Sequence, residues 1–198
     1  MNLRINKYKK YLVDISLASS LSSFPRGKNI SLDIGCGSGE FIAQLALMNP
    51  AEYFIGLEIK YGRIIKCLKK AEINKLDNVK FILCDASLLI KEIIPRRSLN
   101  KVFINNPDPW PKERHEKNRL INSNFLANVY KAMKRKGLLY IKTDDRIYMK
   151  TIKRELSQTK FVINKKKSPF DKALPNTKFQ ELFLNKKKKI YGCKLEKK

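Results

Sequence analysis

The stretch LDIGCGSGEF, from Leu32 to Phe41, sets the architecture of this chain. It follows a short apolar run and precedes an amphipathic segment, and its three glycines stand at alternate positions, Gly35, Gly37 and Gly39. Glycine adopts positive φ angles at little cost and lets a ligand approach the main chain, while the helix that follows offers its N-terminus to a negative group. The spacing predicts a sharp strand-loop-helix turn whose glycines bind a nucleotide.

On both sides of this turn, short apolar runs rich in β-branched residues alternate with amphipathic stretches of helical length. The alternation is typical of a parallel sheet with helices on both faces, so we predict a doubly wound α/β fold. Strands are predicted at residues 30–34, 53–58, 79–84, 101–105, 138–143, 161–164 and 189–194. Helices are predicted at residues 40–48, 63–74, 87–93, 123–133 and 146–156. Gly137 is expected to end the fourth helix as a left-handed cap, and a polar loop is expected through Thr177.

The composition predicts one domain with a polyanionic partner. A chain of 198 residues with 43% hydrophobic content is expected to form a single domain, residues 1–198, in which residues 1–20 are a candidate flexible segment. The net charge of +25 attracts RNA or DNA through counterion release. An AT-biased genome would explain part of the lysine excess, and the lysine runs at 165–167 and 186–189 are also typical of solvated faces.

The cysteines and apolar runs argue against several other classes. The four cysteines are scattered and form no CxxC pair, so we expect neither a disulfide framework nor a metal site. No run approaches the roughly 18 apolar residues of a membrane span, and the N-terminus lacks the apolar core of a signal peptide. We therefore expect a cytoplasmic protein without membrane contact. Either a monomer or a homodimer is compatible with the sequence.

Acidic residues stand at the ends of three consecutive predicted strands: Asp33, Glu58 and Asp85. Open α/β sheets bind ligands at the carboxyl ends of their strands, where a carboxylate can accept hydrogen bonds from ribose hydroxyls. Each acid alone could instead cap a helix, but together they favour an adenosine ligand. S-adenosylmethionine fits better than NAD, because the motif is GxGxG rather than GxGxxG and Asp33 would repel a pyrophosphate.

The stretch NNPDPWPKERHEKNRL, residues 105–120, combines an acid, an aromatic ring and a basic run. Its three prolines exclude a regular helix or central strand and hold Asp108 and Trp110 in a stiff loop. Asp108 is the candidate catalytic carboxylate, while Trp110 could stack on a base or fill the core. The cations that follow suit a phosphate backbone: Lys112, Arg114, His115, Lys117 and Arg119.

Together, LDIGCGSGEF, GLEI, CDA, NPDPWPKERHEKNRL and TDD resemble the bacterial tRNA (guanine-N7)-methyltransferases, which modify guanine 46 in the variable region of tRNA. The resemblance runs from about Leu32 to the C-terminus, and PDPWPKxRHxKxRL is its most specific part. It implies a Rossmann-like class I methyltransferase fold with a seven-stranded, mostly parallel sheet. It also implies S-adenosylmethionine as the methyl donor and tRNA as the substrate.

The resemblance implies roles for individual residues as well. The family's donor-binding acids correspond to Asp33, Glu58, Asp85 and Asp108, and Asp108 is also its proposed catalytic residue. The substrate-binding positions correspond to Lys112, Asp144, Thr177, Lys178, Phe179 and Gln180. The chain departs from the family at Asn106 and Pro107, where an aromatic residue or serine often precedes DPW, and at Gln180, which replaces a Glu and supplies no charge. Asp144 could alternatively cap the helix that begins near Arg146.

Methylation at guanine N7 suits these residues. N7 carries an in-plane lone pair and no proton at neutral pH, so positioning rather than a general base should dominate the catalysis. The base becomes cationic as the methyl group arrives, and Asp108 is the candidate to stabilise that charge. One rival is an amino methyltransferase acting on an exocyclic base nitrogen, because NPDPW loosely echoes an NPPY loop. The other is an RNA-binding protein without catalysis.

Overall fold

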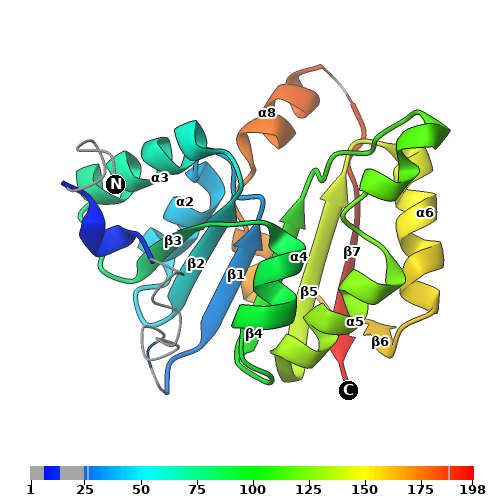
Figure 1. Cartoon of the computed structure of the whole chain (residues 1–198), viewed down its shortest axis with the longest axis horizontal. Helices are drawn as coiled ribbons and strands as arrows, with labels where there is room; N and C mark the ends of the chain where they lie inside the picture. Colours follow the sequence, from blue (N-terminus) through cyan, green and yellow to red (C-terminus); the bar gives the residue numbers. More distant parts are fainter. Residues whose placement is uncertain (1–6, 14–24, 26, 187) are drawn as a thin grey trace.

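A seven-stranded sheet with the order β3-β2-β1-β4-β5-β7-β6 forms the centre of the molecule (Figure 1). The computed structural model describes residues 7–13, 25, 27–186 and 188–198. The strands are β1 (Ile30–Ile34), β2 (Tyr53–Glu58), β3 (Val79–Leu83), β4 (Leu99–Asn105), β5 (Met133–Thr143), β6 (Phe161–Ile163) and β7 (Tyr191–Lys197). Strands β1 to β5 pair in parallel, and β7 lies antiparallel between β5 and β6. The predicted α/β fold with a mostly parallel sheet is confirmed.

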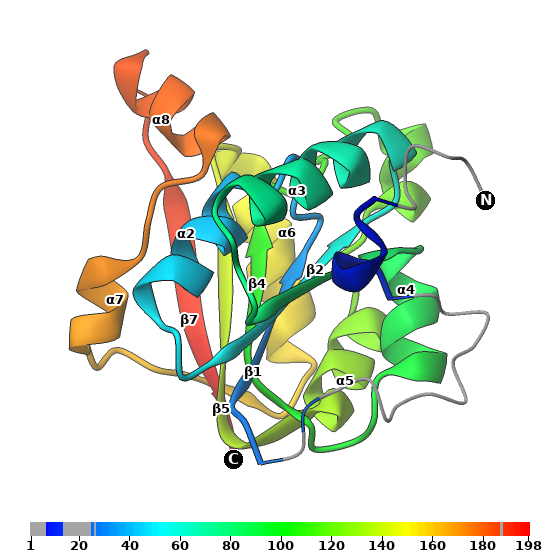
Figure 2. The same ribbon diagram turned by 90° about the vertical axis from the view of Figure 1, so that its left-hand side faces the viewer.

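Helices cover both faces of this sheet (Figures 1 and 2). The helical elements are η1 (Lys9–Tyr11), α2 (Glu40–Met48), α3 (Tyr61–Ile73), α4 (Ala86–Leu88), η4 (Leu89–Ile93), η5 (Glu113–Asn118), α5 (Ser123–Ala132), α6 (Arg146–Ser157), α7 (Pro169–Ala173) and α8 (Lys178–Asn185). Helices α2, α3 and α7 pack on one face, and η4, α5 and α6 pack on the other. Within the described residues, no helix combines the length and apolar character needed to cross a membrane.

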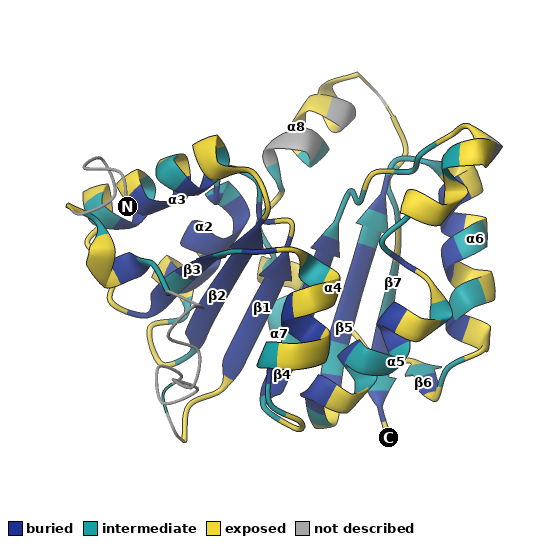
Figure 3. Cartoon of the chain, viewed as in Figure 1, coloured by how far each residue is buried: buried dark blue, intermediate teal, exposed yellow. Residues whose placement is uncertain are grey.

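The central strands are buried on both sides, as Figure 3 shows. Every residue of β1 and β2 is buried, which is why these strands read as continuous apolar runs. Residues that alternate along the strands supply two separate cores. Phe54 and Phe103 pack under α2 and α3, whereas Leu32 and Val102 pack under η4, α5 and α6.

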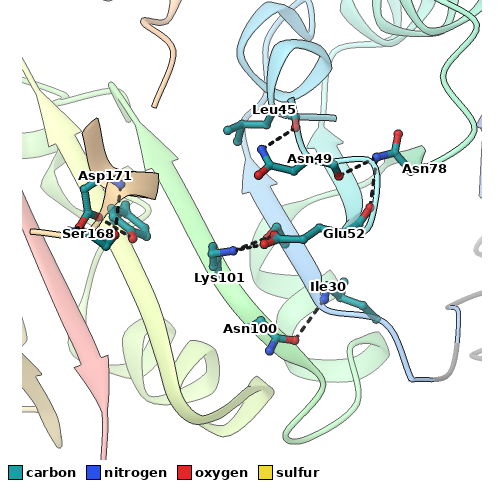
Figure 4. A network of polar contacts seen from close by, with 11 residues as sticks. Ile30, Leu45, Asn49, Glu52, Asn78, Asn100, Lys101, Ser168 and Asp171 are labelled. Atoms are coloured by element: carbon teal, nitrogen blue, oxygen red, sulfur yellow. Dashed lines mark hydrogen bonds and ion pairs between the residues drawn. The ribbon is translucent and has the colours of Figure 1, made fainter. Parts of the chain in front are cut away.

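A polar network holds the amino-terminal side of β1 and β4 to the loop before β2 (Figure 4). The Lys101 ammonium binds both Glu52 oxygens, at 2.5 and 2.7 Å, and also lies 4.1 Å from the centre of the Phe170 ring. The Asn78 amide donates to the carbonyl oxygens of Ala46, Asn49 and Glu52. The Lys101–Glu52 ion pair thus ties β4 to the loop before β2, and the Asn78 contacts tie the residue before β3 to α2 and to the same loop.

The structure corrects the prediction for Gly137. Helix α5 ends at Ala132, and Gly137 lies inside β5, which begins earlier than expected. The left-handed residue is Lys136, with a φ of 62°. A Cβ at position 137 would lie 2.8 Å from the Lys134 carbonyl oxygen, so glycine is required there by close backbone approach rather than by a helix cap.

The carboxyl-terminal and amino-terminal regions also differ from expectation. The predicted polar loop contains α7, which begins with a capping box between Ser168 and Asp171, and it ends at α8, which Thr177 caps. The last strand begins two residues later than predicted and runs to Lys197. In the candidate flexible segment, residues 7–13 pack on β3, where the Val13 N–H donates to the Phe81 carbonyl oxygen at 2.9 Å. Residues 1–6 and 14–20 lie outside the described residues.

Candidate active site

The glycine loop joins β1 to α2 at the carboxyl edge of the sheet. Gly35, Gly37 and Gly39 have φ angles of 72°, 61° and 79°, a region that residues with a Cβ rarely adopt. The N–H groups of Gly35 and Cys36 donate to the Leu57 carbonyl oxygen at 2.8 and 2.9 Å, which fixes the loop to β2. Gly39 then stands directly before α2. The predicted strand-loop-helix turn is confirmed, and its backbone explains the three glycines.

Two neighbouring cavities follow the edge of the sheet beside this loop. The first, about 340 Å³, is lined by residues of the glycine loop and by Thr177 and Leu182. The second, about 420 Å³, is lined by Glu58, Asp108 and Trp110 among others. Four residues line both cavities: Gly35, Arg63, Asn105 and Asn106. We call the pair the strand-edge groove; its size suits a small ligand such as a nucleoside derivative.

Asp33 lies at the bottom of the groove and is only 2% exposed. The pKa of its carboxyl is raised to about 7, mainly by burial; the Asn105 amide at 3.5 Å opposes this shift and the nearby Glu58 charge adds to it. A buried carboxylate without a cation is costly, so this position favours a positively charged ligand group.

Glu58, at the end of β2, is buried and accepts four hydrogen bonds. One oxygen accepts from the N–H groups of Ile59 and Lys60 at 3.0 and 2.9 Å. The other accepts from the Gly37 N–H at 3.1 Å and from the Arg63 guanidinium at 3.4 Å. Four bonds fill the acceptor capacity of a carboxylate. A ligand hydroxyl would therefore replace the two longer bonds, which come from the glycine loop and α3.

Asp85 is placed differently from the other two acids. It is exposed, and its Oδ1 caps α4 by accepting from the N–H groups of Ser87 and Leu88 at 2.8 and 3.0 Å. It lines neither cavity of the strand-edge groove. Helix capping, one of the two roles that the sequence allowed for Asp85, is thus present. A contact of Asp85 with the donor stays a prediction.

The loop after β4 presents Asp108 and Trp110 at the other end of the groove. Asn106 and Trp110 both have positive φ angles, 50° and 43°, and Asp108 Oδ1 accepts from the Trp110 N–H at 3.2 Å. Asp108 is exposed, whereas Trp110 is half-buried and meets the His115 ring edge-on at 5.7 Å. Trp110 lines the groove rather than filling the core, which leaves its ring available beside a bound base.

Arg119 holds this loop in place. Its Nε donates to the Pro109 carbonyl oxygen at 2.8 Å, one terminal nitrogen donates to the Trp110 carbonyl oxygen at 3.3 Å, and the other binds Glu116 at 2.5 Å. The guanidinium also lies 5.5 Å from the centre of the Tyr148 ring, and the side chain is 12% exposed. The geometry favours a positioning role for Arg119 over the predicted RNA contact. Lys112, Arg114 and Lys117 are exposed and remain candidates for that contact.

The remaining predicted substrate residues come from β5 and α8. Asn106 connects both elements to the loop, because its N–H donates to the Lys142 carbonyl oxygen at 2.8 Å and its side-chain amide donates to Thr177 Oγ1 at 3.4 Å. Asp144 is half-buried and lies 3.4 Å from the Lys188 ammonium. It does not cap α6, since Asp145 does so by accepting from the Tyr148 N–H.

The start of α8 completes the site. Thr177 and Gln180 are half-buried, and the Gln180 N–H donates to Thr177 Oγ1 at 3.0 Å. The backbone of Lys178 and Phe179 belongs to α8, but their side chains lie outside the described residues. Sequence reasoning missed Arg63, Asn105 and Leu182, which also line the groove. Among the described side chains, no group of three or more His, Cys, Asp or Glu residues is arranged to hold a metal ion.

Comparisons with known proteins agree with this geometry. Residues 27–193 match the model of a family described as putative methyltransferase. A tRNA (guanine-N(7)-)-methyltransferase of Alkaliphilus oremlandii is 30% identical over 195 residues, which cover 96% of this chain and 92% of the relative. One of Syntrophotalea carbinolica is 32% identical, with 91% and 81% covered. The crystal structure of a 30S ribosomal A1408 methyltransferase from an uncultured bacterium has a TM-score of 0.61 at 19% identity, covering 94% of this chain and 95% of that one, and so shares the fold.

Proposed function

The chain belongs to the family of tRNA (guanine-N7)-methyltransferases, and we propose that it transfers a methyl group from S-adenosylmethionine to N7 of guanine 46 in the variable region of tRNA. One observation carries the proposal: the glycine loop and Asp108 open on the same strand-edge groove, since Gly35, Asn105 and Asn106 line both of its cavities. A ligand on the glycine loop can therefore meet a base beside Asp108.

The groove fits the chemistry of the methyl donor. Buried Asp33 suits the cationic end of S-adenosylmethionine, because a positive charge nearby would offset the cost of ionising that carboxyl. Glu58 is proposed to accept the ribose hydroxyls in place of the bonds from Gly37 and Arg63. The bound donor supplies an electrophilic methyl group on a sulfonium sulfur.

The base is proposed to enter from the side of Asp108 and Trp110. Guanine N7 needs no proton removed before it attacks, so the protein has to orient the ring and stabilise the charge that develops on it. Asp108 Oδ1 is held by the Trp110 N–H, and its second oxygen has no hydrogen-bond partner among the described residues. That oxygen is our candidate to face the imidazole ring as it becomes cationic. Trp110 is proposed to stack on the base.

The substrate is proposed to lie across the exposed cations of the loop and of η5. Lys112, Arg114 and Lys117 are exposed next to the groove, where they can follow a phosphate backbone. Asp144 and residues 177–180 are proposed to contact the target guanosine. Guanine 46 must leave its tertiary base triple and turn into the groove to react. We further propose that the protein works in the cytoplasm, as a monomer or a homodimer.

The proposal is tested with S-adenosylmethionine labelled in its methyl group and two unmodified tRNA transcripts. One carries guanosine at position 46, and the matched control carries adenosine there. We expect label only in the first transcript, recovered as 7-methylguanosine after digestion. Equal labelling of both transcripts would contradict the position, and label recovered on an exocyclic nitrogen would support an amino methyltransferase instead. Donor binding without any transfer would support the RNA-binding alternative.

A further inference from the structure

We propose that a basic hollow beside the strand-edge groove binds a backbone phosphate of the tRNA, next to the guanosine that is methylated; this inference rests on the proposed function. The hollow has a volume of about 300 Å³ and lies where β5 and β7 meet the segment before α7. Its basic and amide side chains belong to Lys142, Asn164, Lys165, Lys166, Lys167 and Lys194. Nothing in the site described above uses these side chains.

The charge of the basic hollow is not balanced from within. Its one carboxylate among the lining residues, Asp171, already accepts from the Lys194 ammonium at 2.7 Å, from the Tyr140 hydroxyl at 2.8 Å and from Ser168. Lys194 and Asp171 therefore neutralise each other. Lys142 and the three lysines at positions 165–167 remain as an excess of positive charge.

Lys142 is the residue that points to an anion. It is half-buried at the carboxyl end of β5, and among the described residues no carboxylate lies within 4.0 Å of its ammonium. Burial lowers the pKa of this ammonium, which reflects the cost of keeping the charge away from water. A bound phosphate would offset that cost with a charge-assisted hydrogen bond. The exposed lysines at 165–167 would surround the bound phosphate at the mouth of the basic hollow.

The position of the basic hollow fits an RNA strand that also reaches the groove. Lys142 precedes Asp144 by two residues, and Leu174, which lines the hollow, precedes Thr177 by three. Because a chain spans at most about 3.3–3.6 Å per residue, the Cα atom of Lys142 lies within roughly 7 Å of that of Asp144, and the Cα atom of Leu174 within roughly 11 Å of that of Thr177. Figures 1 and 2 show the segment from α7 rising to α8 at the carboxyl end of the sheet. Lys142 lines neither cavity of the groove, which favours an RNA phosphate over the donor's carboxylate.

The test compares tRNA binding by Lys142→Gln with that by Lys69→Gln, which removes an exposed charge from α3 near the opposite end of the sheet. Affinity is measured across a series of salt concentrations. We expect Lys142→Gln to bind tRNA several-fold more weakly at low salt and to flatten the slope of log K against log salt by about 0.7–0.9, the value for one phosphate contact. Lys69→Gln should leave the slope unchanged, and both variants should keep the wild-type KM for S-adenosylmethionine.

The double variant Lys165→Gln/Lys167→Gln repeats the measurement with exposed side chains only, so folding is not at risk. An unchanged slope in both the single and the double variant would overturn the phosphate site. A raised KM for the donor in Lys142→Gln would overturn it in favour of the donor's carboxylate. Methyl transfer by the wild-type protein is measured separately: a protein that binds tRNA without methylating it would refute the proposed function, and the slopes would still decide the site.

Discussion

Replacing Arg119 by lysine tests whether the hydrogen bonds of its guanidinium hold the loop that carries Asp108 in place. The guanidinium donates to the carbonyl oxygens of Pro109 and Trp110 at 2.8 and 3.3 Å, and a lysine ammonium keeps the charge but has no fork that reaches both. A hydrogen bond to a charged group contributes about 1.5–3 kcal/mol. Losing one of the two bonds should therefore lower the ratio of ordered to disordered loop about 10- to 150-fold. The positive φ of Trp110 adds backbone strain that the hydrogen bonds from Arg119 must offset.

Two readouts follow this loop directly. Trp110 is the one tryptophan of the chain, so the emission spectrum reports its surroundings alone. For Arg119→Lys we expect the Trp110 emission to shift to longer wavelength and to be quenched more strongly by an added solute than in the wild type. The kcat should fall roughly 10- to 100-fold. The KM for S-adenosylmethionine should change little, because Arg119 lines neither cavity of the strand-edge groove.

Arg114→Lys is the matched control, since Arg114 is exposed and also keeps its charge. It should leave both the emission and kcat at wild-type values. Wild-type emission and turnover in Arg119→Lys would refute the positioning role of Arg119. A tRNA salt slope that flattens in Arg119→Gln would show that the guanidinium of Arg119 contacts RNA instead, as the sequence first suggested.

Three further predictions concern the floor of the site and the core. Burial raises the pKa of Asp33 to about 7, so the affinity for the donor should fall about tenfold per pH unit below 7 as the carboxyl is protonated. Calorimetric titration should show this pH dependence, and Asp33→Asn should abolish the pH dependence. Lys101→Met leaves the Glu52 carboxylate without its cation and should lower the free energy of unfolding, measured in urea, by about 3 kcal/mol, while kcat per folded molecule stays constant. Gly56→Ala places a Cβ 2.6 Å from the Phe81 ring and should cost about 1–3 kcal/mol; an unchanged urea midpoint would contradict the packing.

Local patterns predicted much of this molecule. The glycine loop between β1 and α2 was predictable because alternate glycines between a buried strand and an amphipathic helix have few other uses. The edge that carries Asp33 and Glu58 followed from the rule that parallel strands end on one side of the sheet. The irregular backbone of residues 107–111 followed from the prolines at 107, 109 and 111.

Contacts between distant residues set the rest. Asp85 caps α4 because two N–H groups happen to face it, and nothing in the sequence separates that role from a ligand contact. Arg119 turns inward because β4 and α6 bring Pro109 and Tyr148 to it, whereas the sequence shows only one more cation in a basic run. The short helices α7 and α8 escaped detection because each is too brief for a clear helical periodicity.

Strand cleavage specific for 7-methylguanosine shows whether guanine N7 accepts the methyl group beside Asp108, as we propose. A full-length tRNA transcript is treated with the wild-type protein or with Asp108→Asn, at tRNA concentrations that saturate both, and the cleavage products are mapped to single nucleotides. This role of Asp108 predicts one cleavage at position 46 with the wild-type protein and a strongly reduced yield with Asp108→Asn at equal bound tRNA. Cleavage elsewhere, or an undiminished yield with Asp108→Asn, would contradict it.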